Sequence, residues 1–235
     1  MNLSIVIPVY NEGDDIRNVI EGIEKNIHIP HEILLVYDFL SDSTINPAKK
    51  LQRKFPSIRL TRNIYGKGAL NAIKTGLKKA KSPAVIVTMA DCSDNPKTIN
   101  NMMEKFNQGF DIVCGSRYTK GGKKIGGPFF KTFLSWLAGF SGKYLLGLPT
   151  FDITNSFKLY RKSLLGKITI ESQGGFELGM EIIVKGYFLY HAKVTEVPTV
   201  WKDRTSGESR FKLAAWLPRY IHWYIWALKK RIVLT

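Results

Sequence analysis

The sequence contains few of the residues that build disulfide frameworks or metal clusters. Its 235 residues include two cysteines, Cys92 and Cys114, which are too few for either. Both follow or interrupt apolar stretches, which predicts buried free thiols in a reducing compartment. The four histidines are scattered and show no ligand spacing. This scarcity excludes a disulfide scaffold and a zinc-finger module.

Long hydrophobic runs are also missing, since no segment reaches the roughly 20 apolar residues that span a bilayer. The opening "MNLSIVIPVYNE" has no basic leader and its apolar run stops at Pro8, so we expect no signal peptide. Two shorter segments, "TFLSWLAGFSG" at 132–142 and "YIHWYIWAL" at 220–228, are flanked by lysine or arginine. The second is typical of a helix lying in a membrane interface, or of a terminal helix packed on its domain. The residues leave both alternatives open.

Acidic residues are scarce too: 19 stand against 35 lysines and arginines, for a formal net charge of +16. That excess favours an anionic partner, such as nucleic acid, a phosphorylated substrate or an acidic membrane surface. The basic residues are spread along the chain, without zinc-finger spacing, a helix-turn-helix signal or an RNP-like motif. We therefore expect no nucleic-acid partner. With 44% hydrophobic residues, this length suits one α/β domain, with or without a tail.

Strand and helix patterns alternate through the first half of the chain. Buried-strand patterns occur at 3–9, 32–37, 58–63, 84–89 and 110–117, and helical periodicity at 16–27, 65–80 and 99–106. This alternation predicts βαβ units and a mainly parallel sheet. Ligands bind at the carboxyl ends of the strands of such a sheet. The site is therefore predicted in the loops "PVYNE", "YDFLSD", "MADCSD" and "GSRYTKGG".

The loop "VTMADCSDNP" carries two aspartates three positions apart, Asp91 and Asp94. Carboxylate oxygens suit Mg²⁺ or Mn²⁺, and such an ion would neutralise the charge that develops on a departing diphosphate. The same aspartates are also typical of a turn and helix cap before Pro96. The loop by itself does not decide between these interpretations.

Six segments occur in an order that resembles a known family: "SIVIPVYNE", "RNIYGKGALNAIKTGL", "IVTMADCSDNP", "DIVCGSRYTKGG", "LLGLPTFDITNSFKLYRKSLL" and "EVPTVWKDRTSGESR". The chain resembles the inverting GT-A family 2 glycosyltransferases, and among them the dolichyl-phosphate mannosyltransferase and polyprenyl-phosphate glycosyltransferase type. The similarity runs from about Leu3 to Arg210. It implies a GT-A fold, Rossmann-like, in which helices flank a mainly parallel central sheet.

The resemblance also implies a reaction and roles for particular residues. A hexose of mannose or glucose type would move from a GDP- or UDP-linked sugar to polyprenyl or dolichyl phosphate with inversion, with Mg²⁺ or Mn²⁺ as cofactor. The implied catalytic residues are Asp91, Arg117 and Arg204, and the implied metal ligand is Asp91; Ser93 and Asp94, in the same turn, are further candidate ligands. Asp152 and Glu177 are acceptor-side candidates. The implied nucleotide-sugar contacts are Pro8, Tyr10, Glu12, Val36, Asp38, Ala90, Asp91, Arg117, Arg204 and Arg210.

Two departures from the family pattern concern the donor site. Relatives carry an aspartate where this chain has Met89, and methionine is a poor ligand for a hard cation. The turn that reads Asp-Asp-Gly-Ser-Thr-Asp in relatives is "YDFLSD" here, which keeps Asp38 and Asp42 but loses the glycine. A differently shaped nucleoside pocket is therefore expected.

The expected organisation is a GT-A catalytic domain at 1–210 followed by a basic, aromatic membrane-interface tail at 211–235. Within the domain, 1–118 would bind the nucleotide sugar and 119–210 the acceptor, with a flexible loop and helix at 120–150. The resemblance implies peripheral attachment to the cytoplasmic face of a membrane, with or without a separate anchoring subunit. Two alternatives remain open: transfer to a glycan hydroxyl with Glu177 as base, and a non-catalytic nucleotide-binding subunit recruited to a membrane.

Overall fold

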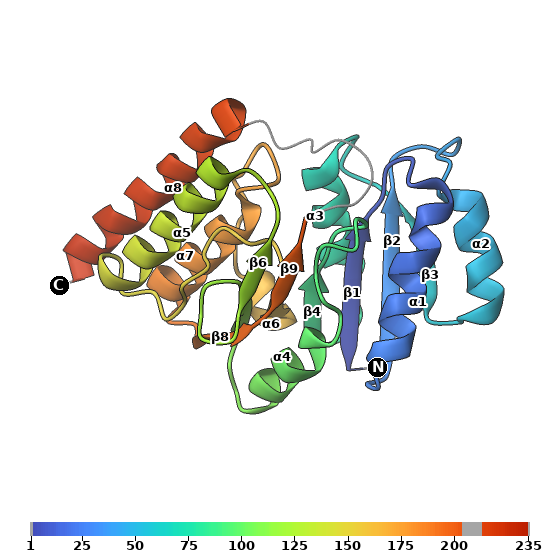
Figure 1. The fold of residues 1–235 in the computed structure, drawn as a ribbon, viewed down its shortest axis with the longest axis horizontal. Helices are drawn as coiled ribbons and strands as arrows, with labels where there is room; N and C mark the ends of the chain where they lie inside the picture. The colour runs from blue at the N-terminus through green and yellow to red at the C-terminus, as the bar shows by residue number, and fades with distance from the viewer. Residues whose placement is uncertain (1, 204–212, 235) are drawn as a thin grey trace.

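The central feature of the structure, a computed structural model that describes residues 2–203 and 213–234, is a seven-stranded sheet (Figure 1). Its strand order is β3-β2-β1-β4-β7-β5-β8. Every pairing is parallel except those of β7, which runs antiparallel to both β4 and β5. The predicted mainly parallel sheet with flanking helices is confirmed, and β7 is an antiparallel insertion that the sequence patterns did not indicate.

The strands that form this sheet are mostly short and buried. They are β1 (Leu3–Pro8), β2 (His31–Tyr37), β3 (Ile58–Arg62), β4 (Ala84–Val87), β5 (Ile112–Ser116), β7 (Lys158–Arg161) and β8 (Val194–Pro198). A separate two-stranded sheet pairs β6 (Lys123–Ile125) in parallel with β9 (Val200–Lys202). Strands buried on both faces read as continuous apolar runs, and β1 is buried along its whole length.

Helices cover both faces of the sheet, so that two hydrophobic cores form. One core lies under α1 (Ile16–Asn26), α2 (Ile45–Lys54) and α4 (Thr98–Asn107). The other lies under α3 (Ala69–Lys79), α7 (Leu178–Tyr190) and α8 (Leu213–Leu234). The remaining helical segments are η1 (Gly13–Asp15), α5 (Phe129–Tyr144) and α6 (Lys162–Leu165). Helix α2 was not predicted, because its buried residues form only a sparse apolar stripe, Ile45, Ala48 and Leu51.

Helix α8 packs on the domain through one face and presents another to solvent. Trp223 and Ala227 are 3% and 0% exposed and belong to the core that α7 helps to form. The Nε1 of Trp223 donates to Ser172 Oγ at 3.2 Å, and the Lys185 ammonium lies over the Trp223 ring. The outward face exposes Ile221, Ile225, Leu228, Ile232 and Val233. Among the helices of the described chain, none combines the length and apolar character needed to cross a bilayer.

A buried carboxylate ties three strands and the loop before β4 together at the end of the sheet where the parallel strands begin. Glu32 is 1% exposed; it accepts hydrogen bonds from Ser4 Oγ at 2.6 Å and Lys81 N at 2.8 Å, and it pairs with Arg59. Burial by itself raises the pKa of Glu32, but the bonds from Ser4, Lys81 and Arg59 outweigh burial and hold the pKa below its ordinary value. Glu32 therefore contributes stability that is present above its unfolded-state pKa and lost as pH falls through its folded-state pKa.

Replacing Glu32 tests this contribution. We expect Glu32→Gln to lower the free energy of unfolding by about 2–3 kcal/mol near neutral pH, because Arg59 and two hydrogen-bond donors lose a charged partner. The deficit should shrink when urea unfolding is repeated at a pH well below the ordinary glutamate pKa, because stability that rests on a lowered pKa is lost as pH falls through the folded-state pKa. Glu21→Gln is the control, since its pair with Lys54 is exposed and worth under about 1 kcal/mol. A deficit of equal size at both pH values would contradict the role given to the carboxylate.

Candidate active site

The loops that carry the predicted site residues meet at the carboxyl edge of the sheet. Strands β1, β2 and β4 are parallel neighbours, so the loops that follow them are adjacent. Because β7 is antiparallel to β4 and β5, the segment that precedes β7 reaches the same edge. That segment contains Asp152 and Thr154. The antiparallel strand therefore brings an acceptor-side candidate beside the loops after β4 and β5.

The first two loops are fixed to each other by Asp42. Its carboxylate is 3% exposed and accepts the N–H of Asn11 at 3.1 Å and of Thr44 at 2.8 Å. Asn11 has φ +55°, and the Glu12 N–H donates to Thr44 Oγ1 at 2.9 Å. Tyr10 is 43% exposed at this edge. The loop after β1 thus keeps its shape through the loop after β2.

Asp38 fixes the loop between β3 and α3. One carboxylate oxygen accepts from Asn63 Nδ2 and the other from the Gly68 N–H, both at 2.8 Å. Thr75 Oγ1 in turn donates to Asn63 Oδ1 at 2.8 Å. Both carboxylate oxygens of Asp38 therefore accept hydrogen bonds from the protein itself.

Three of the predicted nucleotide contacts have buried side chains. Pro8 and Val36 face each other in register across β1 and β2, and the Val36 carbonyl accepts the Val9 N–H at 2.9 Å. Ala90 is 7% exposed and packs in the core under α1. The nucleotide contacts of these residues stay predictions.

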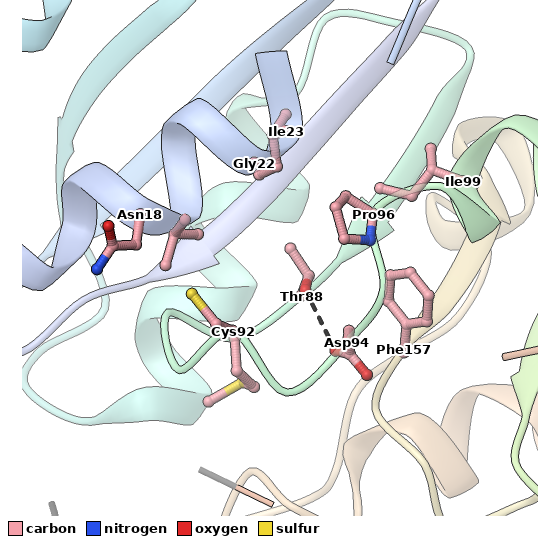
Figure 2. A pocket seen from close by; sticks show the side chains of 11 residues that line it. Asn18, Gly22, Ile23, Thr88, Cys92, Asp94, Pro96, Ile99 and Phe157 are labelled. Atoms are coloured by element: carbon pink, nitrogen blue, oxygen red, sulfur yellow. Dashed lines mark hydrogen bonds between the residues drawn. The ribbon is translucent and has the colours of Figure 1, made fainter. Parts of the chain in front are cut away.

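The loop after β4 carries the predicted metal ligands, and Figure 2 shows the hydrogen bond between Asp94 and Thr88 in this loop. Asp91 Oδ1 accepts the Ser93 N–H at 3.0 Å, and Asp94 Oδ2 accepts from Thr88 Oγ1 at 3.2 Å. Asp94 Oδ1 and Ser93 Oγ are buried and find no hydrogen-bond partner within the described residues. Cys92, which lies between Asp91 and Ser93 in the loop, has φ +56° and is exposed. The expectation of two buried thiols is therefore wrong for Cys92, although Cys114 is buried.

Asp94 is held in an environment that disfavours its charge. Burial, followed by the neighbouring carboxylate of Asp91, raises the pKa of Asp94 to about 7. The hydroxyl of Thr88 and the charge of Arg117 act in the opposite direction but do not compensate. A cavity of about 150 Å³ lies between α1 and this loop, and Asp94 lines it with Asn18, Met89 and Cys92 (Figure 2). A bound cation would supply the charge compensation that Asp94 lacks.

The oxygen atoms of this loop fit a hard divalent cation. The described residues contain no group of three or more His, Cys, Asp or Glu side chains that would hold a metal by themselves. Asp91 and Asp94 offer two carboxylates, and Ser93 adds a buried hydroxyl without a hydrogen-bond partner among the described residues. Mg²⁺ is typically held by one or two carboxylates together with substrate phosphates. This loop therefore matches a site that substrate phosphates complete.

Arg117 is held in a buried ion pair at the end of β5. Its Nε and Nη2 donate to the two oxygens of Asp152 at 2.7 and 2.8 Å, and its backbone N–H donates to the same carboxylate at 3.0 Å. The Arg117 side chain is 9% exposed and that of Asp152 0%. Burial opposes the charge of Arg117, but Asp152 raises its pKa well above the ordinary value. Both groups therefore stay ionised together.

Two hydroxyl groups complete this arrangement, and the sequence patterns did not indicate either. The Nη2 of Arg117 also donates to Ser135 Oγ and Thr154 Oγ1, both at 3.0 Å, and the two hydroxyls lie 2.7 Å apart. Ser135 belongs to α5. Its position within an aromatic helical segment was the available signal, because a serine on one face of such a helix marks a polar contact. The Nη1 of Arg117 forms no hydrogen bond with the described residues.

Further cations stand near Arg117. Lys124 Nζ donates to Thr132 Oγ1 at 2.6 Å and lies over the Trp201 ring. Burial, followed by the charge of Arg117 and with a contribution from Lys131, lowers the pKa of Lys124. This mutual repulsion indicates a positive potential that an anionic ligand would relieve.

Residues 4–169 match the family model of Glycosyl transferase family 2. The chain belongs to this family. A dolichol-phosphate mannosyltransferase of Pyrococcus furiosus is 32% identical, over 90% of this chain and 60% of that protein. A polyprenol monophosphomannose synthase of Mycolicibacterium smegmatis is 29% identical, over 90% and 85% of the two chains. An undecaprenyl-phosphate mannosyltransferase of Micrococcus luteus is 28% identical, over 89% and 87%. The chain thus spans less than two thirds of the Pyrococcus relative and most of the other two.

Solved structures confirm the GT-A fold of this glycosyl transferase family 2 chain. Glucosyl-3-phosphoglycerate synthase from Mycobacterium tuberculosis, in complex with Mn²⁺, uridine diphosphate and glucosyl-3-phosphoglycerate, superimposes with a TM-score of 0.70 at 13% identity. The match covers 97% of this chain and 80% of that one. The complex of the same enzyme with Mn²⁺, UDP-glucose and phosphoglyceric acid gives a TM-score of 0.71 at 15% identity, with the same coverage.

Glu177 lies at the start of α7 in this glycosyl transferase family 2 chain. Its two carboxylate oxygens accept the N–H groups of Gly174 at 2.9 Å and Gly175 at 3.0 Å, and the residue is 1% exposed. These contacts fix the loop before α7. The acceptor-side role of Glu177 stays a prediction, as does that of Asp152. Arg204 and Arg210, the remaining predicted donor contacts, lie outside the described residues.

The environment of Asp94 yields a stability prediction. In EDTA, we expect Asp94→Asn to raise the free energy of unfolding by roughly 1–3 kcal/mol at about pH 8, because the amide removes a buried charge. The gain should grow as pH rises from about 4 to about 7 and then level off, since the folded-state pKa of Asp94 is raised from 3.8 to about 7.

Thermal melts across this pH range measure the effect, and Asp91→Asn serves as the control. Asp91→Asn should give a smaller gain, because it removes the repulsion from the neighbouring carboxylate but leaves the larger cause, the burial of Asp94, in place. Added Mn²⁺ should raise the melting temperature of the wild type more than that of Asp94→Asn. An Asp94→Asn protein less stable than the wild type at pH 8 without metal would refute this account of the loop.

Proposed function

We propose that this family 2 protein is an inverting, divalent-metal-dependent glycosyltransferase that moves a hexosyl group from a nucleoside-diphosphate sugar to a polyprenyl phosphate. The names of the mannosyltransferase relatives support this acceptor class. The structural observation that carries it is helix α5. One side of this helix places Ser135 on buried Arg117, while other positions expose large aromatic rings.

The two kinds of surface on α5 match the two parts of a lipid phosphate. Exposed aromatic residues run along the helix at three- and four-residue spacing: Phe129, Phe133, Trp136, Phe140 and Tyr144. Neighbouring rings in this stripe stack or tilt against each other at 4.7 to 6.2 Å between centroids. An apolar chain lying along this stripe would place its phosphate beside Arg117, Lys124 and Ser135. In this proposal the Nη1 of Arg117 binds the acceptor phosphate.

The donor lies along the loops after β1, β2 and β4. The loops after β1 and β2, which are joined by the hydrogen bond from Asn11 to Asp42, would bind the nucleoside. Asp91, Ser93 and Asp94 would hold a Mg²⁺ or Mn²⁺ ion. When bound, that ion would neutralise the charge that develops on the diphosphate. Met89 does not alter this assignment, because the donor phosphates would complete the coordination and Asp94 contributes a carboxylate where Met89 cannot.

Transfer to a phosphate needs little acid–base chemistry from the protein. An oxygen of the acceptor phosphate forms a bond to the anomeric carbon while the bond from that carbon to the diphosphate oxygen breaks. The electron pair leaves with the diphosphate, and a single displacement inverts the configuration. The nucleophile is already an anion, so no general base is required. The engagement of Glu177 with two backbone N–H groups favours this acceptor over a sugar hydroxyl, which would need a base.

Arg117 acts here by holding two phosphorylated substrates near each other. Its charge reduces the repulsion between the acceptor phosphate and the departing diphosphate, and Asp152 fixes the orientation of the guanidinium. In this proposal the protein attaches peripherally to the cytoplasmic face of a membrane through α5 and the outward face of α8. Both helices lie on the same side of the sheet, away from α1 and α2 (Figure 1). A separate anchoring subunit is compatible with this attachment.

A transfer assay tests the reaction. Protein incubated with polyprenyl-phosphate vesicles, Mg²⁺ or Mn²⁺ and either GDP-mannose or UDP-glucose should add one hexose mass to the lipid. Ser135→Ala should lower the rate roughly 10- to 100-fold, because it removes a hydroxyl beside the acceptor phosphate. Asp91→Asn should abolish most of the metal-dependent rate. Ser141→Ala, on the same helix but bonded only to helix carbonyls, is the control. Hexose on a glycan acceptor and none on lipid phosphate would contradict the proposed acceptor.

Membrane attachment is tested by flotation with anionic phospholipid vesicles. We expect the double variant Phe129→Ser, Phe133→Ser to bind at least about tenfold more weakly, because two exposed rings no longer enter the interface. Leu40→Ser is the matched control, since Leu40 is 72% exposed on the opposite part of the sheet edge. Equal loss of binding in both variants would show that α5 does not make the contact.

A further inference from the structure

The loop after β2 presents an aromatic ring where the resemblance predicts a glycine. Phe39 follows Asp38 directly, and its ring meets that of Tyr10 edge to face, with 5.6 Å between centroids and 81° between planes. Tyr10 is 43% exposed, while Phe39 is partly buried. The two residues come from neighbouring strands, β1 and β2, at the carboxyl edge of the sheet. An aromatic pair is thus fixed at the edge where the donor is proposed to bind.

The distance between this aromatic pair and the loop after β4 suits the base of a nucleotide. In the sheet order, β2 lies two places from β4, and neighbouring strands are about 4.8 Å apart. The aromatic pair is therefore about 10 Å from the loop that carries Asp91 and Asp94. A nucleoside covers a similar span between its base and its first phosphate. With the diphosphate at the loop after β4, the base reaches the loop after β2.

Two carboxylates lie near the aromatic pair, and each already accepts hydrogen bonds from the protein. Both oxygens of Asp38 accept hydrogen bonds from the loop between β3 and α3, and both oxygens of Asp42 accept from Asn11. The two side chains that follow Asp38 in this loop are apolar: Phe39 is partly buried and Leu40 is 72% exposed. Bases stack on aromatic side chains with little dependence on their hydrogen-bonding edge.

We propose that Phe39, supported edge to face by Tyr10, is the residue on which the donor's base stacks, and that it sets affinity for the nucleoside part of the donor. This inference rests on the proposed function and adds to it a specificity-determining contact of this chain. The contact acts on the base alone. It should therefore be separable from everything that recognises the diphosphate.

Calorimetric titration of the full chain with three ligands makes that separation: GDP, UDP and inorganic pyrophosphate, each with Mg²⁺. We expect Phe39→Leu to weaken GDP and UDP binding by roughly 5- to 100-fold, with the larger effect for the larger purine ring. Pyrophosphate, which has no base, should bind the variant within about twofold of wild type. Phe39→Trp, which restores a ring, should recover most of the lost affinity. Leu40→Ala, one residue further along and largely exposed, should change none of the three.

The outcomes separate this inference from the proposed function. Equal weakening of pyrophosphate and the nucleotides by Phe39→Leu would mean that the loop had moved, and would overturn the stacking contact alone. If the Phe39→Leu variant bound GDP and UDP as tightly as the wild type, the stacking contact would also be overturned, while the glycosyltransferase proposal would stay in place. A wild-type protein that binds neither GDP nor UDP in the presence of Mg²⁺ would overturn both.

Discussion

The buried pair between Arg117 and Asp152 determines how the two halves of the site meet. It joins the end of β5 to the segment before β7, and through Ser135 it reaches α5. Removing one member of a buried ion pair leaves an uncompensated charge, and this typically costs about 3–5 kcal/mol. The pair also has an excellent bidentate geometry with additional hydroxyl partners, which is what burial of two charges requires. The arginine therefore stays charged where water is largely excluded.

From that constraint the amphipathic arrangement of α5 follows. The helix turns Ser135 toward Arg117 and buries Gly139 and Gly142, while its aromatic side chains lie on the exposed face. Soluble proteins seldom leave such a contiguous apolar surface uncovered. Helix α8 shows a related division: Trp223 and Ala227 pack inward, and aliphatic residues face solvent. The apolar surface of α5 therefore lies next to the buried polar cluster of Arg117, Ser135 and Thr154.

The sequence predicted those strands and helices whose burial leaves a local pattern of apolar residues. Long apolar runs such as β1 and the one-sided periodicity of α1 identified the parallel sheet and the edge where the loops meet. Helix α2 was missed because its core contacts use only Ile45, Ala48 and Leu51 among polar neighbours. Antiparallel β7 was missed because direction is set by the preceding chain path and leaves no mark in a four-residue strand. The partnership of Arg117 with Ser135 and Thr154 depends on that direction, so no local pattern contained it.

The loop after β4 carries Met89 where the family pattern has an aspartate, so a cation bound there would have fewer carboxylates to hold it. With Met89 in place of an aspartate, the charge available to a cation falls to that of Asp91 and Asp94. The fold disfavours the ionised form of Asp94: its pKa is raised to about 7, and its Oδ1 lacks a hydrogen-bond partner among the described residues. Such a carboxylate gains more from a cation than one already satisfied, because the cation removes a cost that the folded protein otherwise carries. Affinity for metal in this loop would then depend on the poor environment of Asp94 as much as on the number of ligands.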